Sequence, residues 1–172
     1  MTLWVLDADQ AVGGAEEIIK TRRAVIGVPE LDNLLRHKDK DALQRAFQQT
    51  YPNVSADDAK ARVTELWRWV QKVQRNDNVL IKAGSDYLLG QVESGYHYLS
   101  ESEPAIRHSR EIFWRRPALQ ARDVGPALLA RLEPKGFLTE VRPREVEDEV
   151  HVIFNKLTQS GWAKDGFVPA GG

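Results

Sequence analysis

The sequence predicts one domain of the α+β class, in which a mixed, partly closed β-sheet is flanked by helices. Three observations support this class. Strand-like segments gather in the centre of the chain, helical patterns lie before and after them, and the segments do not alternate as regular βαβ units. At 172 residues, the chain is long enough for a single domain with a sizeable core.

The first third of the chain is predicted to contain two short strands and two helices. The opening LWVL is strand-like, and residues 15–24 follow a helical pattern. VIGV at 25–28 predicts a second strand, which Pro29 ends. A second helix is expected over residues 41–51.

The third predicted helix carries two tryptophans. It begins after Ser55, a favoured N-cap residue. Its apolar stripe is formed by Ala59, Val63, Leu66, Trp67, Val70 and Val73. Trp67 is therefore predicted to lie in the core, whereas Trp69 lies off the stripe near charged residues and is a candidate for an exposed stacking surface. Burial of Trp69 under a second layer of the fold is the competing interpretation.

The remaining elements are mostly strands. Strands are predicted over 79–82, 87–92, 111–114 and 136–142, with helical patches within 117–132 and a terminal helix over 145–160. The apolar face of that helix consists of Val146, Val150, Ile153, Phe154 and Leu157.

Composition excludes several classes of protein. A hydrophobic content of 42% and a charged content of 28% are typical of globular domains, and the lack of cysteine excludes disulfides and zinc–thiolate sites. No apolar run is long enough to span a membrane, so a cytoplasmic location is expected. The net charge of −1 hides a basic region, because residues 107–144 contain eight Arg and one Lys against four acidic residues.

Five segments, in this order and spacing, resemble a known family. They are VIGVPELDNLL (25–35), LWRWVQKVQRNDNVLI (66–81), GQVESGYHYL (90–99), RHSREIFW (107–114) and RDVGPALLARL (122–132). The sequence resembles the N-terminal domain of Mrr-like restriction endonucleases, a branch related to the EVE and PUA-like superfamily, over roughly residues 1–142. Where that family usually reads Ile-Gly-Trp, this chain has Ile26-Gly27-Val28.

The resemblance implies a small twisted mixed β-barrel of the PUA/EVE type, with flanking helices and a cleft that holds a flipped, modified base between aromatic side chains. It also implies a domain over residues 1–144, with residues 145–172 as a C-terminal helix and tail that could link to an effector. DNA cleavage is expected from a separate nuclease domain or subunit.

Basic and aromatic residues of the central region are the predicted nucleic-acid contacts, because stacking and phosphate neutralisation need both kinds of side chain. They are Trp69, Lys82, Tyr87, Tyr96, His97, Arg107, Arg110, Trp114, Arg115 and Arg116. The base-pocket region implied by the resemblance comprises Gly27, Val28 and Asp32.

Strand alternation divides these candidates between two faces. Tyr96 and Tyr98 should share one face, partly in the core, with His97 on the other, while Tyr87 stands at a strand entrance as a pocket candidate. His108, Arg110, Ile112 and Trp114 are spaced by two residues, so they should share one face of their strand. A basic strand end is also a common solvated edge that discourages edge pairing.

Recognition of DNA that carries a modified base, in a modification-dependent restriction or defence system, is the first functional hypothesis. A protein-interaction module that docks through Val146, Val150, Ile153 and Leu157, and an RNA-binding PUA-like domain, are the alternatives. No cofactor is expected. An enzyme is disfavoured, because the four histidines are far apart and the acidic-x-Lys triplets at 58–60 and 133–135 fall in a helix and at a proline turn.

Overall fold

The computed structural model describes residues 2–99, 107–115, 118–132, 136–141 and 143–159. The strands are β1 (Leu3–Leu6), β2 (Arg23–Val25), β3 (Asn78–Ala83), β4 (Asp86–Val92), β5 (His97–Tyr98), β6 (His108–Trp114) and β7 (Leu138–Val141). The helices are α1 (Gly14–Thr21), α2 (Lys40–Thr50), α3 (Ala56–Gln71), α4 (Ala121–Val124), α5 (Pro126–Arg131) and α6 (Pro143–Gln159), with 3-10 turns η1 (Ala8–Gln10) and η2 (Leu34–Arg36).

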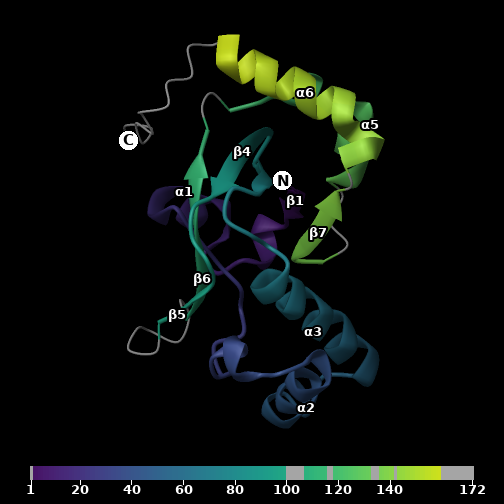
Figure 1. Ribbon diagram of the computed structural model, residues 1–172. Helices are drawn as coiled ribbons and strands as arrows, with labels where there is room; N and C mark the ends of the chain where they lie inside the picture. The colour runs from purple at the N-terminus through teal and green to yellow at the C-terminus, as the bar shows by residue number, and fades with distance from the viewer. Residues whose placement is uncertain (1, 100–106, 116–117, 133–135, 142, 160–172) are drawn as a thin grey trace.

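The described strands form one mixed sheet in the order β2-β6-β4-β3-β1-β7, with β5 paired to β6. β1 runs parallel to β3, and the other paired strands are antiparallel. The sheet curls into a half-barrel with helices around it (Figure 1). The prediction of an α+β fold with a small curled sheet and flanking helices is confirmed.

A tight turn sets the register of the central hairpin. Ala83 of β3 pairs with Asp86 of β4, so only Gly84 and Ser85 form the loop. Gly84 has φ +66°, the positive value that a type II′ hairpin turn requires at its first central position.

Both faces of the sheet are buried. The inner face packs against α1, α2 and α3, and its residues include Trp4, Leu6, Val79, Ile81, Leu88, Ile112 and Trp114. The outer face packs under α4, α5 and α6, and its residues include Leu3, Val5, Leu80, Tyr87, Leu89 and Val141. Two cores therefore share one sheet, and helices cover both sides of it (Figure 1).

α6 is part of the outer core. Val146, Ile153 and Leu157 are at most 3% exposed and pack in that core. The Glu149 carboxylate accepts hydrogen bonds from the N–H groups of Ala127 and Leu128 at 3.0 and 2.6 Å, which ties α6 to the start of α5. The expectation that this apolar face docks a partner protein is therefore wrong, because the face is already covered by its own sheet.

The predicted strand at 25–28 is displaced toward the N-terminus. Arg22 adopts a left-handed conformation with φ 53°, which ends α1 three residues earlier than the pattern predicted. The chain then enters β2 at once, and Arg23 pairs across the ladder with Glu111, to which its guanidinium donates at 3.1 Å. Ile26 lies beyond the strand, where it forms an isolated bridge with Ala11 and donates its N–H to the His108 carbonyl at 3.0 Å.

Candidate functional site

The predicted nucleic-acid contacts lie at two ends of the sheet. Tyr96, His97 and Arg107 lie where β5 and β6 begin, near the predicted base-pocket loop. Lys82 and Tyr87 face each other at the opposite end of the hairpin, near the end of β6 that carries Arg115. Arg116 lies outside the described residues. The structure therefore does not join these residues in one interface.

Five predicted contact residues are buried, which corrects their assignment to a surface. They are Trp69, Tyr87, Tyr96, Arg110 and Trp114, with exposures of 0%, 8%, 9%, 2% and 1%. Trp69 packs against Phe137 with ring centroids 5.5 Å apart, and Tyr87 lies in the outer core. Arg110 and Trp114 do share one face of β6, as alternation predicted, but that face is the inner core.

The predicted base-pocket loop is fastened to the strands by a chain of buried hydrogen bonds. The Leu34 N–H donates to the Tyr96 hydroxyl at 3.3 Å, and that hydroxyl lies 2.7 Å from His108 Nδ1. His108 Nε2 lies 3.1 Å from the Leu31 carbonyl, which can only accept, so Nε2 carries the proton and Nδ1 accepts from Tyr96. Burial raises the pKa of Tyr96, which keeps its hydroxyl protonated as a donor.

The other members of this region also have structural partners. The Arg107 guanidinium donates to the Pro29 carbonyl at 3.3 Å, and the exposed Asp32 pairs with Arg36 at 2.6 Å. Val28 is 2% exposed and packs in the inner core, while Gly27 and His97 are exposed. Tyr96 and Tyr98 lie in and against the inner core, which confirms their predicted common face. The loop, Tyr96 and His108 thus form a packed anchor.

Acidification is expected to loosen this anchor. Burial lowers the pKa of His108 below its ordinary value of 6.5. Between that ordinary value and the lower folded pKa, the unfolded chain binds the extra proton, so the free energy of unfolding falls as pH falls below about 6.5. Unfolding by urea at pH 7.5 and pH 5.0 should show a larger loss for the wild type than for His108→Gln. An equal loss in the two proteins would contradict this linkage.

The C-terminal end of α3 is held by the buried guanidinium of Arg110. Its Nε donates to the Trp69 carbonyl at 2.8 Å and its Nη2 to the Val70 carbonyl at 3.1 Å. These are carbonyls of the last turn of the helix, which lack partners within it. The third group, Nη1, donates to the Ser94 carbonyl at 3.2 Å. β6 therefore fixes the position of the last turns of α3.

The outer side of those turns forms a pocket of about 400 Å³. Its lining is Thr2, Trp4, Lys40, Thr64, Trp67, Arg68, Lys72 and Glu140. Four of these residues share one face of α3, because spacings of three, four and eight residues from Thr64 return to the same side of a helix. Lys40 comes from the start of α2, which runs antiparallel beside α3 (Figure 1). We call this the α3 pocket.

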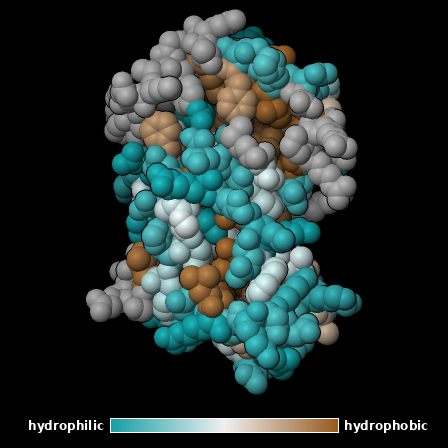
Figure 2. All heavy atoms as spheres, viewed as in Figure 1, coloured by the Kyte–Doolittle hydropathy of each residue, from teal (hydrophilic) through white to brown (hydrophobic). Residues whose placement is uncertain are grey.

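The α3 pocket joins an aromatic ring with unpaired positive charge. Trp67 packs against the inner core, in line with the prediction, but it is only partly buried, so part of its side chain lines the pocket. Lys40, Arg68 and Lys72 make no ion pair with any described residue, whereas the pocket contains one carboxylate, that of Glu140. Figure 2 shows mainly hydrophilic residues over the α2–α3 hairpin. Sequence reasoning missed this site, although the spacing of Trp67, Arg68 and Lys72 on one helix face was visible.

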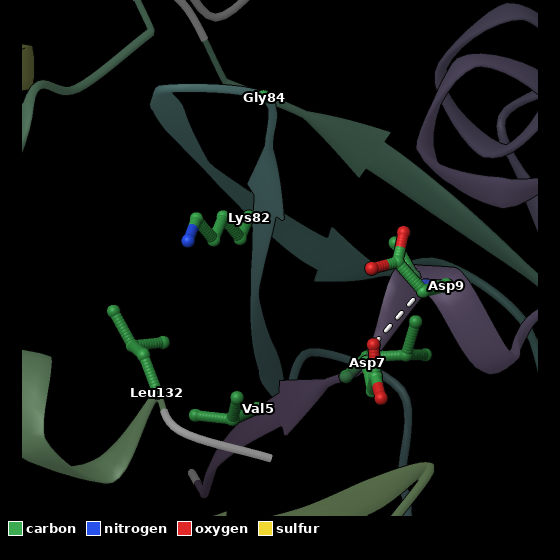
Figure 3. Close-up of a pocket in the computed structure, with 8 residues that line it drawn as sticks. Val5, Asp7, Asp9, Lys82, Gly84 and Leu132 are labelled. Carbon is green, nitrogen blue, oxygen red and sulfur yellow. Dashed lines mark hydrogen bonds between the residues drawn. The ribbon is translucent and has the colours of Figure 1, made fainter.

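A second pocket of about 380 Å³ lies at the carboxyl ends of the parallel strands β1 and β3. Figure 3 shows Lys82 on one side and Asp7 and Asp9 on the other, above Val5 and Leu132. The Asp7 carboxylate already accepts hydrogen bonds from the Asp9 N–H at 3.1 Å and the Gln10 amide at 2.7 Å. Lys82 is thus exposed, and it shares the lining of this pocket with two carboxylates, which would repel a phosphate bound there.

The described part of the chain contains neither a metal-binding cluster nor a membrane-spanning helix. In that part of the chain, no three His, Asp or Glu side chains converge in a way that could hold a metal ion. No described helix combines the length and apolar character needed to cross a bilayer.

Comparison with known families places the chain in one of them. The chain belongs to a family defined by a domain of unknown function, DUF8426, which matches residues 6–126. This range runs from the end of β1 to the start of α5, so it includes the α3 pocket residues contributed by α2 and α3. No curated protein and no solved structure matches the chain.

Proposed function

We propose that this protein is a non-catalytic nucleic-acid recognition module, and that the α3 pocket is its contact site. The observation that supports the proposal is the combination, in one concavity, of a partly exposed indole with three cations that form no ion pair with any described residue. Phosphate neutralisation by Lys and Arg supplies salt-dependent affinity, and a base can stack on Trp67 whatever its sequence. Neither contribution requires a metal or a nucleophile.

The positions of Arg68 and Lys72 are favourable both for the stability of α3 and for contact with a phosphate group. Arg68 and Lys72 lie at the C-terminal end of α3, where the helix dipole stabilises positive charge. Because Lys40, Arg68 and Lys72 form no ion pair with any described residue, no such pair has to be broken before they contact phosphate. Binding should therefore gain the full release of counterions from the nucleic acid.

The pocket offers one effective stacking wall. Trp67 is its partly exposed ring, whereas Trp4 is 2% exposed and its indole N–H donates to Asp77 at 2.9 Å. Stacking on one ring contributes about 1–3 kcal/mol per base. Flipping a base out of a duplex costs a few kcal/mol, which a single ring does not clearly offset.

Removal of the ring and removal of a charge should have different effects on binding. Trp67→Ala should weaken binding of a fluorescein-labelled oligonucleotide by about tenfold or more, with an unchanged dependence on salt. Lys72→Ala should weaken binding and also reduce the slope of log affinity against log salt by about 0.7–0.9. Fluorescence anisotropy titrations at four salt concentrations measure both quantities.

Lys60→Ala is the matched control for these variants. Lys60 is an exposed lysine on α3 that lines neither this pocket nor its neighbour, so its removal should change affinity and slope much less than Lys72→Ala does. Equal effects of the two lysine variants would indicate general attraction to the surface and contradict the site. No binding by the wild type at low salt would refute the function.

The resemblance adds a finer proposal, that the bound nucleotide carries a modified base and that a separate effector acts on the DNA. Parallel titrations with otherwise identical oligonucleotides test it, using cytosine, 5-methylcytosine, 5-hydroxymethylcytosine, 4-methylcytosine or N6-methyladenine. Tighter binding to one modified oligonucleotide would support a reader of modification. Equal binding to all would indicate that the module recognises the backbone and the faces of the bases, without distinguishing a modification.

A further inference from the structure

The α3 pocket continues into a larger hollow on the other side of Arg68. This hollow has a volume of about 700 Å³ and is lined by residues of α3, the α2–α3 connection and β7, among them Val54, Arg62, Glu65, Leu138 and Thr139. The two concavities share Thr64 and Arg68. They also share β7 as a wall, because Leu138 and Thr139 line one and Glu140 lines the other. Together they form a groove between α3 and β7.

β7 is the edge strand of the described sheet and pairs only with β1. The Asp7 N–H donates to the Phe137 carbonyl at 2.9 Å, which identifies this pair as hydrogen-bonded in the β1–β7 ladder. Hydrogen-bonded pairs alternate with non-hydrogen-bonded pairs along an antiparallel ladder. Leu138 and Glu140 are therefore non-hydrogen-bonded, and their backbone groups point away from β1, toward the free edge.

One hydrogen bond supports this direction. The Leu138 N–H reaches Glu65 Oε1 of α3 at 3.5 Å, on the side of β7 that faces the groove. The Leu138 carbonyl and the N–H and carbonyl of Glu140 have no partner among the described residues, so they remain as free edge groups along the groove. A backbone N–H beside a carbonyl offers a donor and an acceptor, which matches the hydrogen-bonding edge of an unpaired base.

From this arrangement we infer that the groove binds a single strand of nucleic acid that lies along the free edge of β7. This inference rests on the nucleic-acid binding proposed above. Lys40, Arg68 and Lys72 would contact phosphates, Trp67 would stack one base, and the free groups of Glu140 would bond a base edge. A duplex hides those edges in base pairs, and the single ring of the pocket favours a base that is already unpaired.

Binding to single and double strands of one sequence tests the inference. A labelled 12-nucleotide DNA strand, the RNA strand of the same sequence and the DNA duplex are titrated at one low salt concentration. At least one single strand should bind at least tenfold more tightly than the duplex. Duplex binding that equals or exceeds both, and that Trp67→Ala weakens, would overturn the inference and leave the proposed function standing. No binding to any of the three would refute the proposed function itself.

Two substitutions at one position test the contact with the strand edge. Glu140→Ala removes a carboxylate and keeps the N–H, so it should tighten binding of the single strand several-fold. Glu140→Pro removes both, and proline is tolerated here because this N–H is not part of the β1–β7 ladder. It should bind several-fold more weakly than Glu140→Ala. Equal affinities of the two folded variants would overturn the edge contact. If the proline variant does not fold, the comparison of single strand with duplex still tests the inference.

Discussion

Arg110→Met is expected to lower the free energy of unfolding by about 3–5 kcal/mol, because it removes the hydrogen bonds that a buried guanidinium donates to three backbone carbonyls. Methionine fills a similar volume but donates no hydrogen bond. The carbonyls of Trp69, Val70 and Ser94 would then be left buried without their donor. Each unsatisfied acceptor costs about 1–3 kcal/mol, partly relieved by water.

The charge of this residue is compensated without a direct ion pair. Burial lowers the pKa of Arg110 to about 10, while the attraction of the Asp77 carboxylate opposes this decrease, so the guanidinium stays charged at neutral pH. It also lies 5.5 Å from the centre of the Trp69 ring, at cation–π distance. Asp77 keeps its own donors, the N–H groups of Thr2 and Gln74 and the indole of Trp4.

Urea unfolding at pH 7 of the wild type, Arg110→Met and Arg110→Lys measures the effect. Lysine retains the charge but cannot reproduce the planar fork that reaches three carbonyls, so its loss should be intermediate. Arg75→Met is the control, because Arg75 is exposed and its substitution should change stability by less than about 0.5 kcal/mol. A loss below 1 kcal/mol for Arg110→Met would show that these hydrogen bonds do not hold α3.

Arg110 also illustrates what strand alternation can and cannot predict. The pattern of β6 correctly placed Arg110 on the face of Ile112 and Trp114. An arginine is stable inside a core only where acceptors converge on it, and here they come from α3 and from the segment before β5. Those acceptors are backbone carbonyls, which every sequence has, so only the three-dimensional structure identifies them.

The two tryptophans of α3 could not be distinguished by helical periodicity. At 100° per residue, Trp67 and Trp69 lie about 80° to either side of the line formed by the other stripe residues, Ala59, Val63, Leu66, Val70 and Val73. Residues distant in sequence decide between them, because Phe137 and Arg110 pack on the side of Trp69. The opposite side is left for Lys40, which completes the α3 pocket around Trp67.

Local signals predicted the elements more successfully than their surroundings. The Ser55 hydroxyl caps α3 by accepting from the Asp58 N–H at 3.2 Å, and the turn at Gly84 joins the predicted hairpin. The placement of Tyr87 at a pocket failed because the sheet is covered on both faces. The sequence does contain a signal of this, since NVLI and YLLGQV are nearly continuous apolar runs, typical of strands buried on both sides.

Gly90→Ala is expected to lower the free energy of unfolding by about 2–3 kcal/mol, although alanine normally restricts the unfolded chain and slightly stabilises a protein. Gly90 lies in β4 opposite Trp114 of β6. A Cβ atom there would lie 2.6 Å from Ile112 Cγ2 and 2.7 Å from the Trp114 ring, closer than carbon atoms can approach. Because both neighbours are fully buried in the inner core, the ring or the strand must move.

The matched control is Gly95→Ala, where an added Cβ meets no atom within 4 Å, so a change below about 0.5 kcal/mol is expected. Thermal and urea unfolding measure both variants. Trp114→Leu in the Gly90→Ala background tests the cause, because a smaller side chain should accommodate the new methyl group. The two substitutions together should then cost less than the sum of their separate costs. Strict additivity would show that the strain lies elsewhere. A combined cost below the sum would confirm that contact with Trp114 is the reason that position 90 requires glycine.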